Sequence, residues 1–182
     1  MQVAIIGAGP LGRWLALAAA RAGYTVLLED VMPSNLHHAQ EYLRQQLGPA
    51  ALPTVNFVST IEDAVREADL AIDCVPDELE SKLEIFCLLD RMAPPRTVLM
   101  TPTKRLSIAD LASCTYRAGK CLALVTDAQE LTGAKLSENS ANGESTRMLL
   151  RTPPPVTTET VAIAKEFWER IGFSPHFEAD ET

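Results

Sequence analysis

Short apolar runs and longer segments of helical periodicity alternate along the first two thirds of this chain. The apolar runs have the length of buried parallel strands and predict strands at residues 3–6, 25–28, 55–58, 69–75, 97–100 and 121–125. Helical spacing of apolar positions and capping signals predict the intervening helices, at residues 14–20, 33–47, 61–68, 79–92 and 107–112. Strands that alternate with helices form right-handed βαβ units. The predicted fold class is therefore α/β, a doubly wound and mostly parallel sheet of Rossmann type in a single domain.

The rest of the chain gives a weaker pattern. We expect a mobile polar loop at residues 130–145 and a strand at 148–150. A helix at 157–171, ended by Gly172, and an edge strand at 174–177 should follow. The prediction is one Rossmann-type dinucleotide-binding domain over residues 1–182, with core βα units in 1–125 and a looser C-terminal part in 126–182.

The most informative stretch joins the first strand to the first helix and reads Gly-x-Gly-x-x-Gly, at Gly7, Gly9 and Gly12. Gly7 allows a tight turn out of the strand, Gly9 leaves room for a pyrophosphate against the backbone, and Gly12 lets the helix pack closely on the strand. The free N–H groups and positive dipole end of that helix would face the phosphates. This motif predicts a dinucleotide site.

An acidic pair, Glu29 and Asp30, follows the second apolar run. Asp30 comes 18 residues after Gly12, near the position where a carboxylate binds the ribose in dinucleotide-binding folds. An acid there favours NAD over NADP, because a 2′-phosphate would meet a like charge. The alternative is a strand–helix turn that uses its glycines without binding a ligand.

Composition narrows the function classes. The chain is 47% hydrophobic with a net charge of −8, and its one basic cluster is Lys104-Arg105, which argues against a nucleic-acid partner. It shows no signal-peptide pattern and no apolar run near the roughly 20 residues of a membrane helix, so we expect a cytoplasmic protein without membrane contact. The four cysteines lack CxxC spacing and the three histidines form no zinc pattern, so we expect reduced thiols and no metal.

With these residues in view, the chain resembles the NAD-binding domain of the 3-hydroxyacyl-CoA dehydrogenase family over nearly its whole length. The segments that carry the resemblance are residues 3–9, 18–26, 68–72, 75–82 and 106–108. The segment with Pro76, Glu80 and Lys82 is more specific than the glycine motif. The resemblance implies an oxidoreductase of fatty acid metabolism with NAD as its cofactor.

The same resemblance implies a set of cofactor-binding residues: Gly7, Gly9, Pro10, Leu11, Gly12, Asp30, Val75, Asp77 and Lys82. Within this set, it implies that Asp30 holds the adenosine ribose. Asp77 stands where the family has an acid near the nicotinamide, and Lys82 stands at a lysine that contacts the cofactor.

The chain departs from the family at the residues of catalysis. The family uses a histidine as general base, oriented by a glutamate, and a serine that positions the substrate oxygen. Val125 stands at the histidine, Met148 at the glutamate and Lys104 at the serine. Because valine cannot accept a proton, we expect the catalytic base to be degenerate. A positioning asparagine belongs to the family's C-terminal helical domain, which also forms the dimer; we expect this chain to lack that domain.

Charged residues near the carboxyl ends of the strands are candidates for a replacement chemistry. Lys104 could hold a substrate carboxylate, thioester oxygen or phosphate. Asp127 or Glu130 could act as a base if burial raised its pKa. The candidate catalytic residues are thus Lys104 and Asp127. The alternative for these two and for Glu130 is that they are solvated charges on a loop.

Trp14 is a further departure, because the family commonly has a small residue there. Its indole either crowds the glycine loop or packs in the core, and its large apolar area favours the core.

Three functional hypotheses remain. The first is an NAD-dependent oxidoreductase acting on an acyl-CoA or another small molecule, with slow hydride transfer that Lys104→Ala or Asp127→Asn abolishes. The second is a non-catalytic dinucleotide-binding or sensing module, which binds NADH without turnover. The third is one half of an enzyme completed by a separate helical subunit, which requires an exposed apolar surface. A homo-oligomer or such a helical partner is expected.

Overall fold

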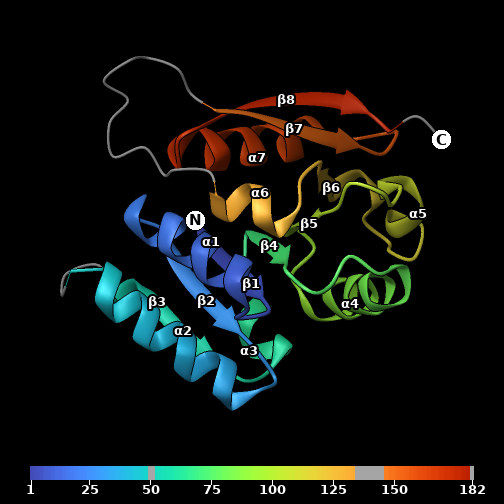
Figure 1. The fold of residues 1–182 in the computed structure, drawn as a ribbon. Coiled ribbons are helices and arrows are strands. Elements are labelled where there is room, and N and C mark those ends of the chain that lie inside the picture. Colours follow the sequence, from blue (N-terminus) through green and yellow to red (C-terminus); the bar gives the residue numbers. More distant parts are fainter. Residues whose placement is uncertain (49–51, 134–145, 181–182) are drawn as a thin grey trace.

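The computed structural model describes residues 1–48, 52–133 and 146–180. In these ranges the strands form a single sheet (Figure 1). The strands are β1 (Gln2–Ile6), β2 (Thr25–Glu29), β3 (Val55–Val58), β4 (Leu70–Asp73), β5 (Val98–Pro102), β6 (Cys121–Leu124), β7 (Thr146–Thr152) and β8 (Phe173–Ala179). Their order across the sheet is β3-β2-β1-β4-β5-β6-β7-β8. Strands β1 to β6 are parallel, β7 runs antiparallel to β6, and β8 pairs in parallel with β7.

Helices cover both faces of this sheet. They are α1 (Pro10–Arg21), α2 (Pro33–Gln46), α3 (Ile61–Val65), α4 (Leu79–Met92), α5 (Ile108–Ala112), α6 (Ala128–Gly133) and α7 (Thr158–Arg170), with short 3-10 turns η1 (Leu52–Thr54) and η2 (Ala118–Lys120). One face packs against α1, α2, α6 and α7 and the other against α3, α4 and α5, each with its own apolar core (Figure 1). The predicted doubly wound, mostly parallel α/β domain is confirmed. None of the helices in the described ranges has the length and apolar content needed to cross a bilayer.

The strand order reverses between β1 and β4. From β1 the sheet continues through β2 to β3 on one side, and through β4 to β5 and β6 on the other. The connections therefore leave β1 and β4 in opposite directions, and a crevice opens at the carboxyl ends of these two strands. Residues that follow β1, β2 and β4 are brought to that crevice.

Most predicted elements differ from the structure only at their ends, and two of the differences bear on the site. The fourth strand ends at Asp73, so Cys74 and Val75 lie beyond it, in the turn towards α4. Of the predicted loop at residues 130–145, the first part belongs to α6, whereas residues 134–145 lie outside the described ranges. Helix α6 forms because the Asp127 carboxylate accepts the backbone N–H of Glu130 at 2.9 Å, in the manner of an N-cap, and Leu131 is buried in the core.

Trp14 belongs to the core, as its apolar area predicted. Its side chain is buried, and its ring meets Phe173 edge-on at 6.1 Å between centroids. Phe173 in turn packs edge-on against Trp168 of α7 at 5.5 Å. The indole therefore joins α1 to the C-terminal elements and does not crowd the glycine loop.

Candidate functional site

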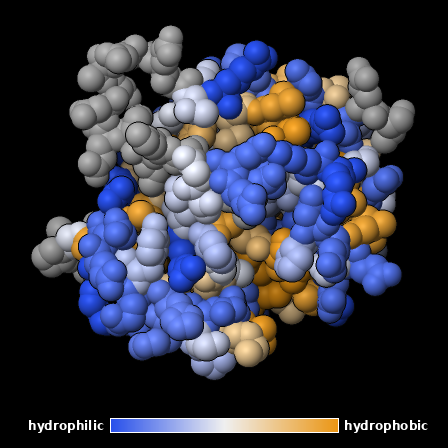
Figure 2. All heavy atoms as spheres, viewed as in Figure 1, coloured by the Kyte–Doolittle hydropathy of each residue, from blue (hydrophilic) through white to orange (hydrophobic). Residues whose placement is uncertain are grey.

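A cavity of about 550 Å³ lies at the carboxyl ends of β1, β2 and β4, in the crevice where the strand order reverses. Seven of the nine predicted cofactor-binding residues line it: Gly7, Gly9, Pro10, Leu11, Asp30, Val75 and Asp77. The other two, Gly12 and Lys82, do not. In the view of Figure 1, hydrophobic residues are exposed among hydrophilic ones on the surface between α2 and α4 (Figure 2).

The glycine loop has the geometry that its sequence predicted. Gly7 has a φ of +103°, a conformation that favours glycine, and its N–H donates to the carbonyl of Glu29 at 2.8 Å. A Cβ on Gly12 would lie 1.8 Å from the carbonyl oxygen of Gly7, so the close packing of α1 on the loop requires glycine there. A Cβ on Gly9 would meet no atom within 4 Å, because that position faces open space beside the first turn of α1. A phosphate could occupy this space and meet the unpaired N–H groups of the helix end.

The carboxylate of Asp30 is fixed by the loops on either side of it. One oxygen accepts the N–H of Met32 at 2.8 Å, and the other accepts the N–H of Ala8 at 2.8 Å and the amide of Asn35 at 3.0 Å. A carboxylate can accept about four hydrogen bonds, so capacity for one further donor remains. This arrangement ties the glycine loop to the end of β2 and suits a hydroxyl ligand.

Asp77 lines the cavity and carries an unsatisfied polar atom. Its Oδ1 is buried and has no hydrogen-bond partner in the described part of the chain. A buried acceptor without a partner is costly, so a donor that a ligand brought within reach of this oxygen would be favoured. Together with the open space at Gly9 and the remaining acceptor capacity of Asp30, this atom fits the polar groups of a dinucleotide.

Lys82 lies behind the cavity in a closed polar cluster. Its side chain is fully buried, and its Nζ donates to Thr101 Oγ1 at 2.8 Å, to Asp73 Oδ2 at 3.2 Å and to the carbonyl of Val75 at 3.4 Å. Thr101 also donates to Asp73 at 2.6 Å. Burial raises the pKa of the Asp73 carboxyl, and the neighbouring Lys82 opposes that rise. The three N–H donors of a lysine thus all have acceptors in the protein.

Glu29 is a cavity residue that the sequence analysis did not single out. It is 5% exposed, and burial, reinforced by the adjacent Asp30, raises its pKa to about 7. Cys74 also lines the cavity, and burial raises the pKa of its thiol, which keeps it neutral. The signal for Glu29 was weak: the predicted strand ended at residue 28, and only when the strand is continued through Glu29 does alternation place this side chain on the face opposite Leu28.

The candidate catalytic residues form an exposed ionic cluster. Lys104 Nζ donates to Asp127 Oδ2 at 2.9 Å and also to Glu130 Oε1. The Glu130 N–H and the Lys104 ammonium hold the pKa of Asp127 below its usual range, and the two carboxylates, Glu130 first, raise the pKa of Lys104. The burial that would make Asp127 a base near neutral pH is therefore absent. Asp127 lines the main cavity, whereas Lys104 does not.

Val125 and Met148 come together in the structure. Both line a second cavity of about 540 Å³ beside α6, and the N–H of Val125 donates to the carbonyl of Leu149 at 3.0 Å. The fold thus places side by side the two positions at which the resemblance puts a base and its orienting acid, and both carry apolar side chains here.

The parallel sheet, its switch-point cavity and the glycine loop define a Rossmann-type dinucleotide-binding domain. Residues 2–124 match the family model of the 3-hydroxyacyl-CoA dehydrogenase NAD-binding domain, and the chain belongs to this family. The predicted family is confirmed.

Curated and solved relatives agree with this assignment. The "Probable 3-hydroxybutyryl-CoA dehydrogenase" of Bacillus subtilis is 29% identical over 136 residues, which cover 68% of this chain and 47% of that protein. The mitochondrial hydroxyacyl-coenzyme A dehydrogenase of Sus scrofa is 31% identical over 134 residues, 64% of this chain and 43% of that protein. The chain thus spans about half the length of these relatives. The structure of (S)-3-hydroxybutyryl-CoA dehydrogenase from Ralstonia eutropha shares the fold, with a TM-score of 0.83 at 18% identity over 99% of this chain and 64% of that one.

Proposed function

We propose that this chain binds NAD(H) in the switch-point cavity. Its pyrophosphate would lie against Gly9 and the first turn of α1, and a ribose hydroxyl would donate to Asp30. The observation that carries the proposal is the convergence of seven predicted cofactor residues on one cavity, among them Asp77 with its unpaired Oδ1. Lys82, which the resemblance gave a cofactor contact, would instead support the floor of the site.

The charge of the cavity supports NAD over NADP. Its charged lining residues are four acids, Glu29, Asp30, Asp77 and Asp127, and no Lys, Arg or His lines it in the described part of the chain. A 2′-phosphate would find no cation to pair with and several like charges nearby. The phosphates common to both cofactors rely on backbone N–H groups and the helix dipole.

The chemistry is proposed to be that of a degenerate member of the dehydrogenase family. Bound NAD(H) supplies the hydride acceptor or donor. A general base would have to take the hydroxyl proton, and Val125 cannot do so. Lys104 and Asp127 neutralise one another in exposed positions. These observations favour a dinucleotide-binding or sensing module over an efficient 3-hydroxyacyl-CoA dehydrogenase.

The test is a titration with NADH, followed by energy transfer from tryptophan, for wild-type protein and two site variants. Gly9→Val fills the space where the pyrophosphate would lie, and Asp30→Ala removes the ribose acceptor. Gly9 has a φ of −65°, so valine at this position would strain neither the backbone nor the packing. Gly48→Val is a matched control, because a Cβ there also meets nothing within 4 Å.

We expect saturable binding that both site variants weaken at least about tenfold and the control leaves unchanged. Absence of binding at millimolar NADH would refute the proposal. Binding that survives Gly9→Val would place the cofactor elsewhere.

A further inference from the structure

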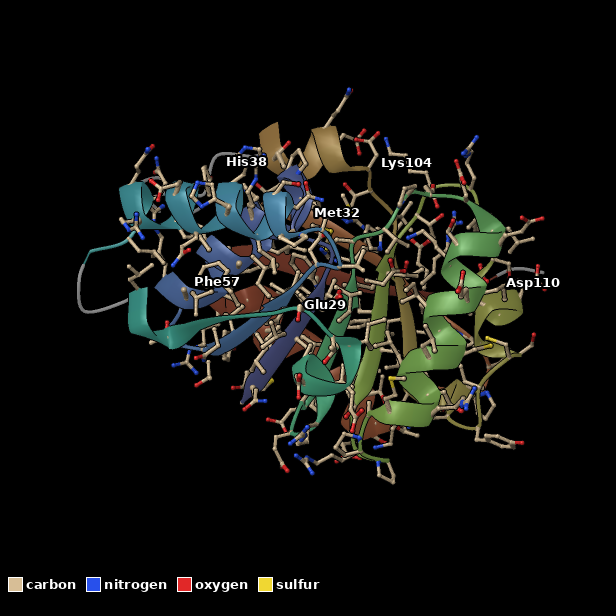
Figure 3. The ribbon with its side chains drawn as sticks, turned by 90° about the horizontal axis from the view of Figure 1, so that it is seen from below. Glu29, Met32, His38, Phe57, Lys104 and Asp110 are labelled. Carbon is tan, nitrogen blue, oxygen red and sulfur yellow. The ribbon has the colours of Figure 1, made fainter. Side chains whose placement is uncertain are left out.

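Glu29 is a nearly buried residue that lines the cavity. Glu29 is the last residue of β2, near the centre of Figure 3, and its side chain is 5% exposed. No hydrogen bond or ion pair to its carboxyl occurs among the described residues, although the residue lines the cavity. Its oxygens are not among the fully enclosed polar atoms that lack a partner, so the carboxyl opens into the cavity, where a ligand could reach it.

The surroundings of Glu29 suit a flat apolar group. On the sheet its neighbours are Ile6 of β1 and Val58 of β3. Across the cavity, α3 contributes Ile61 and α4 contributes Ile85. The carboxyl is thus one polar group on an otherwise apolar wall, the usual composition of a site for an aromatic ring system.

Glu29 and Asp30 serve different parts of the cavity. Asp30 bonds to the glycine loop and to Asn35 of α2. Because side chains alternate along a strand, the side chain of Glu29 points to the face of the sheet opposite that of Leu28, and α3 and α4 cover this face. If Asp30 holds the adenosine ribose, as proposed above, the base attached to that ribose must leave the sugar towards one of the cavity walls. The apolar wall with Glu29 is the one built for a ring.

The protonation state of Glu29 fits this role. Its pKa of about 7 means that the neutral acid is well populated at neutral pH. The charged groups that share the cavity are Asp30, Asp77 and Asp127, all acids, and the elements packed against Glu29 present Ile6, Val58, Ile61 and Ile85. No cation in the cavity lining favours the ionised form. A neutral carboxyl offers one O–H donor and one acceptor side by side.

We propose that the neutral carboxyl of Glu29 recognises the adenine base of the dinucleotide, donating to a ring nitrogen and accepting from the adjacent amino group. Adenine presents such an acceptor beside its amino donor. An ionised carboxylate could only accept, so it would lose one of the two bonds. The inference rests on the proposed NAD(H) binding and adds to it a residue that selects the base and couples binding to a proton.

The test compares wild type with two variants at pH 6 and pH 8. Glu29→Gln keeps one donor and one acceptor but cannot ionise, and Glu29→Leu removes both groups. The probes are NADH, AMP as the adenine half, and ribose 5-phosphate as AMP without its base. Binding is followed by tryptophan energy transfer for NADH and by displacement of NADH for the other two. Thermal unfolding of each variant confirms that it is folded.

In wild type we expect NADH and AMP to bind roughly fivefold more weakly at pH 8 than at pH 6, because the neutral fraction of Glu29 falls across that range. Glu29→Gln should bind equally at both pH values, near the wild-type affinity at pH 6. Glu29→Leu should bind about tenfold more weakly than Glu29→Gln. Ribose 5-phosphate should not respond to the variants, and its own pH dependence, which includes ionisation of its phosphate near about pH 6, is the baseline against which AMP is compared.

The outcomes separate this inference from the function on which it rests. If wild type binds no NADH at either pH, the proposed function is refuted and this inference with it. If NADH binds but Glu29→Leu matches Glu29→Gln, or Glu29→Gln keeps the wild-type pH dependence, this inference alone is refuted. An equal response of ribose 5-phosphate would also overturn it, since the contact would then be to the sugar or phosphate.

Discussion

Two neighbouring regions at the carboxyl edge of the sheet differ in how far their polar groups are satisfied. Around β1, β2 and β4, Gly9 faces open space, Asp77 has an unpaired oxygen and Glu29 has no partner. Past the ends of β5 and β6, Lys104 and Asp127 satisfy one another, and beside α6 Val125 and Met148 are apolar. Unsatisfied groups at a cavity indicate a ligand, whereas paired or apolar groups do not require one. The difference supports the proposal that this domain binds a cofactor without efficient hydride transfer.

The largest expected effect comes from the cluster behind the cavity. Lys82→Met would leave Asp73 buried without its partner, and we expect a loss of about 3–5 kcal/mol in the free energy of unfolding, measured by denaturant titration. Replacing both residues, as Lys82→Met with Asp73→Leu, should recover much of that loss. If Lys82→Met instead leaves stability unchanged and weakens NADH binding, Lys82 contacts the cofactor directly, as the family resemblance implied.

The second prediction concerns the pH dependence of stability through Glu29. Its pKa rises from 4.5 to about 7 on folding, so the folded state binds this proton more tightly. The resulting stabilisation is complete below about pH 4.5 and is lost as the pH rises through about 7, by on the order of 3 kcal/mol. Denaturant titrations across this range should show the extra pH dependence in wild type and not in Glu29→Gln. Parallel profiles for the two proteins would contradict the burial of this carboxyl.

The third prediction separates two glycines of one motif. Gly12→Ala forces a Cβ to within 1.8 Å of the Gly7 carbonyl oxygen, so we expect a loss of about 1–3 kcal/mol in stability together with weaker NADH binding. Gly9→Ala meets no protein atom and should cost about 1 kcal/mol or less. Equal thermal destabilisation by the two substitutions would show that the loop packs differently from the structure described.

The smallest effect is expected in the region past the ends of β5 and β6. Lys104→Ala removes exposed ion pairs, so thermal unfolding should change little, and the NADH dissociation constant should change by less than about twofold. The pKa of Asp127 should rise towards its ordinary value, which NMR titration of its carboxyl can follow. A large loss of NADH affinity would place Lys104 at the cofactor and weaken the contrast between the two regions.

Sequence spacing predicted the features that depend on local geometry. The glycine loop and Asp30 follow from a strand, a turn and a helix, whose relative placement a short motif fixes. The burial of Lys82 could not be predicted in this way, because its partners Asp73 and Thr101 lie on two different strands. A lysine near a ligand-binding loop has the same local pattern whether it faces the ligand or the core.

Two features were missed from the sequence, helix α6 over residues 128–133 and the place of Glu29 in the cavity, and each left a usable signal. The polar composition of residues 130–145 obscured α6, although Asp127 stands three residues before Glu130, the spacing of a helix cap. Glu29 was considered only as part of an acidic pair, and strand alternation separates it from Asp30. In both cases composition was given more weight than position.

The most direct test of the central claim is one experiment with two stages. Tryptophan energy transfer first measures NADH binding, and a 3-oxoacyl-CoA ester is then added at saturating NADH while NADH oxidation is followed by absorbance. The account predicts saturable NADH binding. It also predicts NADH oxidation that is slower than in a dehydrogenase relative assayed in parallel, by a factor of about 10² or more. Rapid oxidation, or no binding of NADH, would contradict it.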